Sequence, residues 1–170
     1  MPYHCEVRGR FGPVTFIDAR RAGVFEGKCG TSRYNRLERH IVAGLLVCFQ
    51  KLYDSNFATK GRWAVLSPYR SQVQDIRSLV SSHPILKQME ITCATVDGMQ
   101  GGEKDIVVIS TVRSNQHRSI GFLDDYRRFN VAFTRPRKSL IVIGNSDTLA
   151  KDKNWEAFIS YTRENSKSDY

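Results

Sequence analysis

Hydrophobic and polar positions along the chain follow two alternating periods, which predicts strands separated by helices. Short apolar runs predict strands at residues 13–18, 63–67, 91–96, 105–112 and 138–143. The run at 105–112 is almost continuously apolar, and such a run is typical of a strand that is covered on both faces. Because strands covered on both faces are typical of parallel sheets, the pattern predicts a parallel sheet.

Between the first predicted strands, the apolar residues recur with the spacing of a helix. Asn35 is suited to cap the first helix, and Glu38, three residues later, can reach back to the backbone as in a capping box. Apolar residues then recur at spacings of three and four and predict one buried stripe, formed by Leu37, Ile41, Leu45, Cys48 and Leu52. Ser67 and Pro68 are typical of the start of a second helix. The apolar side of that helix is formed by Val73, Ile76 and Val80.

The last third of the chain predicts two more helices. Asp124 and Asp125 favour a helix start, because acidic side chains are stabilised at the positive end of the helix macrodipole. Pro136 should end this helix at or before Arg135, since the residue before a proline is pushed out of the helical region. A closing helix is expected over residues 154–164. Its apolar side chains are Trp155, Phe158 and Ile159.

Strands that alternate with helices predict one doubly wound α/β domain, with a mostly parallel sheet and helices on both faces. We expect this domain to span residues 13–164, with an N-terminal extension (1–12) before it and a disordered tail (165–170) after it. The 170 residues are 41% hydrophobic and 25% charged, which is within the range of globular domains. No apolar run reaches about 18 residues and no secretory signal is evident, so no membrane contact is expected.

Charge and cysteine content narrow the functional classes. The chain has 26 Lys and Arg against 17 Asp and Glu, a net charge of +9 that is typical of proteins that meet polyanions. A soluble basic surface would give the same number, and charge alone does not separate the two. The four cysteines form no C-x-x-C pair, which argues against a zinc ribbon or a disulfide framework. We therefore expect no bound metal site of this kind, and a cytoplasmic or nuclear location.

The glycine-rich loop at residues 98–104 follows a predicted strand and superficially resembles a phosphate-binding loop. A P-loop needs G-x-x-x-x-G-K-[ST] followed by a helix, whereas here Glu103 precedes Lys104 and a strand follows. Doubly wound folds nevertheless bind ligands beyond the carboxyl ends of their strands, where we expect Thr95, Gln100 and Glu103. The alternative is a glycine-rich turn between two strands.

Residues 126–137 contain four arginines in one short element. On a continuous helix, Arg128 and Arg135 would share a face, because they are seven residues apart. Pro136 would fix the end of the element, so that Arg135 could be held against a phosphate. The alternative is a solvated basic helix in which Arg135 only stabilises the helix C-terminus.

Several motifs in this order resemble the second RecA-like domain of superfamily 1 helicases, in the branch of the nonsense-mediated-decay helicase and senataxin. The resemblance covers roughly residues 13–160. The motifs that carry it are Asn35-Arg36 with Glu38, then residues 67–72, 95–105, 110–115, 120–123, 127–135 and 143–145. This resemblance supports the same fold class, a RecA-like α/β domain.

The resemblance implies roles for residues near a nucleotide. Arg135 would be an arginine finger that reaches the γ-phosphate held by the P-loop of a first domain, and Arg36 is similar to a second phosphate-sensing arginine. Glu103 would hydrogen-bond the ribose. Gln100 and Gly101 would form the loop that couples the nucleotide to nucleic acid. The position of Arg36 in the first turn of a helix is unfavourable for a cation by roughly 0.3–1 kcal/mol, which an anion or full solvation would offset.

The resemblance also implies contacts with the backbone of a single strand of RNA or DNA, made by Ser67, Tyr69 and Thr95. Two positions depart from the family pattern. Pro136 stands where alanine is usual, and Gly102 stands where a larger residue is common. The proline affects the direction in which Arg135 leaves the backbone.

The chain carries neither a P-loop nor an acidic strand end suited to Mg²⁺. The resemblance therefore implies that ATP and Mg²⁺ are shared with the N-terminal RecA-like domain of the same polypeptide, and that these 170 residues alone are inactive. We expect a fragment of a longer helicase that does not need to oligomerise. The alternative is a catalytically silent RecA-like module that binds nucleic acid or a protein partner.

Overall fold

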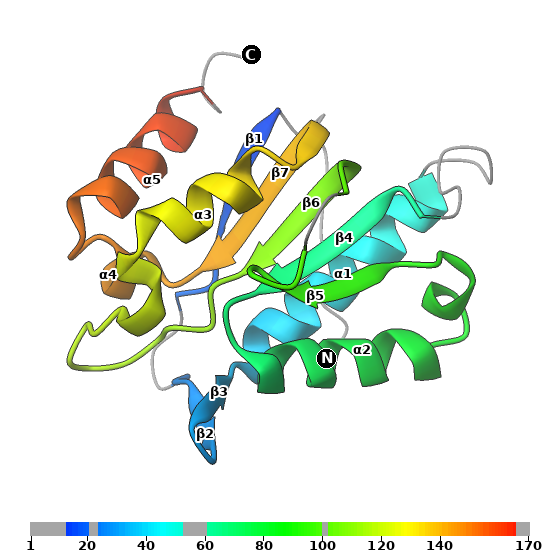
Figure 1. The fold of residues 1–170 in the computed structure, drawn as a ribbon, viewed down its shortest axis with the longest axis horizontal. Coiled ribbons are helices and arrows are strands. Elements are labelled where there is room, and N and C mark those ends of the chain that lie inside the picture. Colours follow the sequence, from blue (N-terminus) through cyan, green and yellow to red (C-terminus); the bar gives the residue numbers. More distant parts are fainter. Residues whose placement is uncertain (1–12, 21–23, 53–60, 100–101, 166–170) are drawn as a thin grey trace.

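The computed structural model describes residues 13–20, 24–52, 61–99 and 102–165 (Figure 1). Some of the sequence predictions concern parts outside this description. They are the extension 1–12, the tail residues 166–170, Gln100 and Gly101, and the side chains of Leu52 and Arg128.

The centre of the fold is a five-stranded parallel sheet, as the sequence predicts. Its strands are β1 (Val14–Asp18), β4 (Trp63–Ser67), β5 (Thr92–Thr95), β6 (Lys104–Ser110) and β7 (Pro136–Gly144). They are arranged in the order β1-β7-β6-β4-β5, and all four pairings are parallel. The central strand β6 is fully buried from Ile106 onward, which explains its continuously apolar sequence.

Helices cover both faces of the sheet (Figure 1). On one face lie α1 (Arg36–Leu52) and α2 (Arg70–Ser82), and on the other lie α3 (Tyr126–Phe133) and α5 (Lys153–Asn165). Shorter turns complete the layers. They are η1 (Leu86–Gln88), η2 (Gly121–Asp124) and α4 (Ser146–Leu149). The prediction of a doubly wound α/β domain is confirmed.

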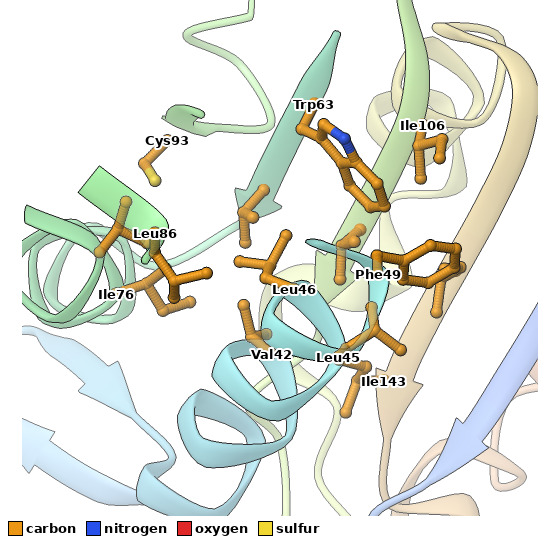
Figure 2. Close-up of a cluster of buried hydrophobic side chains, with 14 of the residues drawn as sticks. Val42, Leu45, Leu46, Phe49, Trp63, Ile76, Leu86, Cys93, Ile106 and Ile143 are labelled. Atoms are coloured by element: carbon orange, nitrogen blue, oxygen red, sulfur yellow. The ribbon is translucent and has the colours of Figure 1, made fainter. Parts of the chain in front are cut away.

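Each face of the sheet has its own hydrophobic core. Between the sheet and α1, the rings of Phe49 and Trp63 meet edge to face with centroids 4.9 Å apart (Figure 2). On the opposite face, Trp155 packs against Phe129, and its indole Nε1 donates a hydrogen bond to the carbonyl oxygen of Leu123 at 2.9 Å. The two cores bury both faces of the sheet.

Helix α1 is rotated relative to the predicted stripe. The buried apolar side chains of α1 are Val42, Leu45, Leu46 and Phe49, so Leu45 alone of the predicted residues with described side chains is buried. Leu37 and Ile41 are only partly buried. A polar contact explains this rotation. The side chain of Glu38 is fully buried and accepts a hydrogen bond from Ser110 of β6, so the side of the helix that contains Glu38 faces the sheet.

Helix α2 begins later than the sequence predicts. Tyr69 is its N-cap, and the prediction that Ser67 and Pro68 start the helix is wrong. Ser67 still belongs to the sheet, where it is the register partner of Thr95 and its carbonyl oxygen accepts a hydrogen bond from Val96 N. The predicted apolar side of α2 is confirmed, because Val73, Ile76 and Val80 are all buried.

A small hairpin lies between β1 and α1 in the chain, where the sequence predicted no strand. Strands β2 (Gly27–Cys29) and β3 (Ser32–Tyr34) pair in antiparallel fashion, and Figure 1 shows them beyond the carboxyl ends of the central strands. Gly30 makes the turn with a φ of +58°. Three-residue strands are too short to show an alternating pattern, so the hairpin has no clear sequence signal.

Helix α3 follows the prediction at both ends. The side chain of Asp125 accepts a hydrogen bond from Arg127 N at 3.2 Å, and the helix ends at Phe133. Strand β7 then starts at Pro136, so Arg135 lies between helix and strand. Arg128 and Arg135 therefore do not share a helix face, because the helix stops before the residue that precedes proline.

Candidate functional site

The predicted site residues divide between two opposite edges of the sheet. All five strands begin at one edge, the amino edge (Val14, Trp63, Thr92, Lys104 and Pro136), and end at the other, the carboxyl edge (Asp18, Ser67, Thr95, Ser110 and Gly144). The seven residues of β6 separate these edges by about 20 Å. Glu103 and Arg135 lie at the amino edge, whereas Arg36, Ser67, Tyr69 and Thr95 lie at the carboxyl edge.

At the amino edge the structure brings Glu103 and Arg135 together. Glu103 directly precedes β6 and Arg135 directly precedes β7, and the backbone N–H of Lys104 donates to the carbonyl oxygen of Arg135 at 3.1 Å. The expectation that Glu103 follows the carboxyl end of a strand is wrong. Thr95 does lie at such an end, but the chain then returns to the opposite edge before β6 begins.

The amino edge is strongly cationic. Two of its acidic side chains are paired with cations: Arg137 Nε lies 2.8 Å from Glu103 Oε2, and Lys138 Nζ lies 3.2 Å from Asp105 Oδ2. The Arg137–Glu103 pair is more than half exposed, and exposed pairs contribute little stability. An anionic ligand can therefore replace the partner of Arg137 at little cost. The cations along this edge are Arg62, Lys104, Arg135, Arg137 and Lys138.

Arg135 rests on the helix that precedes it. Its Nε donates to the carbonyl oxygen of Val131 at 3.1 Å, so it satisfies one of the last carbonyls of α3. This is the contact expected of a helix-end cation. Within the described residues the contact engages Nε alone, and the two terminal Nη groups remain as donors for an anion.

At the carboxyl edge, the hydroxyl groups of Ser67 and Thr95 differ in accessibility. Ser67 is fully buried and its Oγ accepts a hydrogen bond from Tyr69 N at 3.4 Å. Thr95 is half-buried, and its Oγ1 accepts from Gly98 N at 3.0 Å. Tyr69 is buried as well. Of the three predicted strand-binding residues, Thr95 alone offers a partly exposed side chain in this structure.

Arg36 is separated from Arg135 by the whole sheet. It is exposed at the first turn of α1, where its guanidinium lies 5.7 Å from the ring centroid of Tyr34. The preceding residue, Asn35, donates from its side chain to the carbonyl oxygen of Val112, just beyond the end of β6. The length of β6, about 20 Å, therefore lies between the two ends of the sheet at which Arg36 and Arg135 are found.

A buried polar network lies beneath the carboxyl edge, and the sequence prediction missed it. Gln72 accepts from Asn35 N at 2.8 Å and donates to Ser110 Oγ at 3.0 Å, and all three residues are buried. Ser110 in turn donates to Glu38 Oε2 at 2.7 Å. The network ties the starts of α1 and α2 to the end of β6. The available signal was the polar residues Asn35, Glu38 and Gln72 at the starts of two otherwise amphipathic helices.

Burial raises the pKa of the Glu38 carboxyl from 4.5 to about 7. Loss of hydration is the largest cause, and it outweighs the hydrogen bonds from Ser110, Val112 and Thr111, which favour the ionised form. The carboxyl therefore changes its charge near neutral pH, inside the network that joins the two helices.

We expect Glu38→Gln to flatten the pH dependence of stability. The wild-type folded state binds this proton more tightly than the unfolded state does, so the group favours folding most below pH 4.5 and loses that contribution as the pH rises to about 7. The loss amounts to about 3 kcal/mol. Urea unfolding of both proteins at pH 4.5, 6 and 7.5 measures it. Parallel curves for the two proteins would contradict the raised pKa.

Val112 carries unusual backbone geometry next to this network. Its φ is +71°, which is rare for a β-branched residue, and its N–H donates to Glu38 Oε2 at 2.9 Å. The turn directs the next residue, Arg113, inward, where only 4% of its surface is exposed. Glu38 thus helps to hold the backbone that positions Arg113.

Arg113 joins the β2–β3 hairpin region to the start of α2. Its Nε lies 3.1 Å from Glu26 Oε1, and its Nη1 donates to the hydroxyl of Tyr69 at 3.2 Å. Glu26 also accepts from Ser114 N at 2.6 Å. A Cβ on Gly121, where φ is +55°, would overlap Arg113 Nη1, so glycine is required there. Arg113 was not among the predicted site residues, although it lies in the motif at residues 110–115.

Within the described ranges, His, Cys, Asp and Glu side chains form no group of three or more that could hold a metal ion. Nor does any helix in the described part of the chain combine the length and the apolar character needed to cross a membrane.

The chain was compared with known proteins. A family model described as an AAA domain matches residues 3–147. A probable helicase of Dictyostelium discoideum is 39% identical over 158 residues, which cover 91% of this chain and 16% of that protein. A regulator of nonsense transcripts 1 homolog of Arabidopsis thaliana is 38% identical over 138 residues (79% and 11%). Helicase sen1 of Schizosaccharomyces pombe is 42% identical over 130 residues (75% and 8%).

The chain spans less than a fifth of the length of each of these relatives. The matched family and the matched relatives agree with the motifs and with the five-stranded parallel sheet. The resemblance drawn from the sequence is therefore confirmed. The chain belongs to this AAA-domain family, as a RecA-like C-terminal domain of the superfamily 1 branch of the nonsense-mediated-decay helicase and senataxin.

Proposed function

We propose that the chain is the C-terminal motor domain of an ATP-dependent helicase that acts on single-stranded RNA or DNA. The observation that carries this proposal is the division of the predicted residues between two edges of one rigid sheet. Glu103 and Arg135 lie at the cationic amino edge, and Thr95 lies at the carboxyl edge. A motor must join a nucleotide site to a nucleic-acid site, and β6 joins these two edges directly.

At the amino edge, the residues present fit the phosphates and ribose of ATP. Arg135 would stabilise the charge that develops on the γ-phosphate, and Glu103 would accept hydrogen bonds from ribose hydroxyls. Bound ATP supplies the phosphoryl group, and Mg²⁺ would neutralise part of its charge. Glu103 and Asp105 at this edge are each paired with a cation, so the Mg²⁺ ligands and the P-loop are assigned to the N-terminal RecA-like domain of the same polypeptide. Gln100 and Gly101 remain in the proposal from the family resemblance.

At the carboxyl edge, the proposal assigns the single strand to Ser67, Tyr69 and Thr95. Since Ser67 and Tyr69 are buried, their contribution would come through the backbone and through the position of the α2 N-terminus. Arg36 lies at this same edge, so we place it with the nucleic acid and no longer with the γ-phosphate. Proteins with these functions act where single strands occur, in the cytoplasm or the nucleus.

The test is to compare the chain alone with a protein that also contains the first RecA-like domain. We expect ATP hydrolysis stimulated by single strands in the two-domain protein and none in the chain alone, because the chain lacks the P-loop. A P-loop lysine variant of the first domain is the control for contaminating ATPase.

Two results would count against the proposal. Robust hydrolysis by the pure 170-residue chain would show that the missing groups are not needed. A two-domain protein that binds single strands but never hydrolyses ATP would favour the alternative of a silent binding module.

A further inference from the structure

An aromatic ring is exposed at the carboxyl edge beside the predicted strand-binding residues. Phe122, in η2, has 53% of its surface exposed, and its ring centroid lies 5.7 Å from that of Tyr69 with the planes tilted by 51°. Tyr69, by contrast, is almost fully buried. Phe122 thus packs against an anchored ring while much of its own surface faces solvent.

The backbone that presents Phe122 is fixed on both sides. Gly121 before it adopts a φ of +55° and packs closely against Tyr69 and Arg113. Leu123 after it is fully buried, and its carbonyl oxygen accepts the hydrogen bond from Trp155 Nε1. The exposure of Phe122 is therefore set by the fold and does not come from a loose loop.

The support beneath this ring is a buried ion pair. Arg113 binds Glu26 with Nε and the Tyr69 hydroxyl with Nη1. Side chains of this pair are no more than 5% exposed, and burying two charges costs free energy unless many hydrogen bonds compensate. Because its guanidinium is enclosed, Arg113 positions Tyr69 and does not itself meet a ligand.

The surroundings favour a nucleic-acid ligand. The exposed arginines Arg36 and Arg70 lie at the first turns of α1 and α2, at the same edge of the sheet, and the chain has a net charge of +9. An exposed ring at the same edge as exposed cations is the combination that binds single strands, in which unpaired bases stack on aromatic faces while phosphates meet the cations. A duplex keeps its bases stacked on one another and cannot use such a ring without unstacking.

We propose that Phe122 is a base-stacking residue for a single strand that crosses the carboxyl edge, with Tyr69 and Arg113 as its support. This inference rests on the proposed function and names the part of the strand, the base, that this edge binds. Phosphate contacts weaken strongly as the salt concentration rises, whereas base stacking depends little on salt. Stacking on Phe122 would therefore add a contribution to the affinity that changes little with salt.

The test measures binding of the 170-residue chain to short fluorescent oligonucleotides at low ionic strength. Phe122→Ala should weaken binding to a single strand with bases by about tenfold, because stacking on an aromatic side chain contributes about 1–3 kcal/mol per base. Phe122→Trp should bind at least as well as the wild type. The matched control is Tyr126→Ala. Tyr126 is also 53% exposed, but it is the first residue of α3 and lies outside η2.

An oligonucleotide of abasic sites separates stacking from charge, because it keeps the phosphates and has no bases. Phe122→Ala should bind this strand as the wild type does. Equal weakening for both strands, or the same affinity in Phe122→Ala and Tyr126→Ala, would overturn the stacking role. Failure of the wild-type chain to bind any single strand would instead contradict the proposed function. Thermal midpoints of all variants confirm that each is folded.

Discussion

Replacing Arg135 with lysine is expected to lower kcat for ATP by a factor of about 10³ or more in a protein that also contains the first RecA-like domain. Arginine fingers contribute this much in phosphoryl transfer, because their planar guanidinium meets the charge of the transferring phosphoryl group. Lysine keeps the positive charge but loses the fork of donors. Nucleotide affinity should change far less, since the interaction strengthens in the transition state.

The resting contact of Arg135 offers a competing explanation that this variant separates. If Arg135 serves only the carbonyl of Val131 at the end of α3, lysine should cause a small loss of stability and leave turnover almost normal. Measuring kcat and the thermal midpoint of the same variant distinguishes the two roles. A normal kcat would remove Arg135 from the catalytic residues.

Arg36→Lys is the matched control for the catalytic prediction. Both arginines lie at or next to a helix terminus, but Arg36 lies at the carboxyl edge and Arg135 at the amino edge, and β6 spans about 20 Å between these edges. We therefore expect Arg36→Lys to leave kcat at saturating nucleic acid within about threefold of the wild type, well under 1 kcal/mol. A loss as large as that of Arg135→Lys would mean that the two edges meet the same nucleotide through a rearrangement absent from this structure.

The sheet could be predicted from the sequence because the apolar composition of its strands reflects how deeply they are buried. The apolar run that became β6 fits a strand covered on both faces, and Pro136 marked the end of α3 correctly. Motif order then identified the family. The strand and helix-end signals are local, since each depends on neighbours within a few residues.

The arrangement of the site depends on contacts that no local pattern encodes. Glu38 appeared to be a capping residue, yet its carboxylate binds Ser110 and Val112, more than 70 residues away. The edge at which a predicted residue lies follows from whether it precedes or follows a strand, and the predicted strands already carried this signal for Glu103 and Arg135. The family resemblance assigned Arg36 and Arg135 to one phosphate, and they lie at opposite edges of the sheet in the structure.

Replacing Arg113 with methionine is expected to destabilise the domain more than any other single substitution of a side chain at the carboxyl edge. Removing one member of a buried ion pair costs about 3–5 kcal/mol, because the other charge stays buried. Glu26 keeps its contact with Arg33 at 2.8 Å, so we expect the lower value, about 3 kcal/mol. For a domain of this size, that corresponds to a fall of about 6–12 °C in the thermal midpoint.

Two further variants show whether burial is the cause. Arg137→Met breaks the exposed pair with Glu103 and should cost less than about 1 kcal/mol, because solvent screens it. Adding Glu26→Gln to Arg113→Met should recover part of the loss, since it removes the buried charge that Arg113 had neutralised. If Arg113→Met and Arg137→Met lowered the midpoint equally, burial of the Glu26–Arg113 pair would not be the cause of the stability loss.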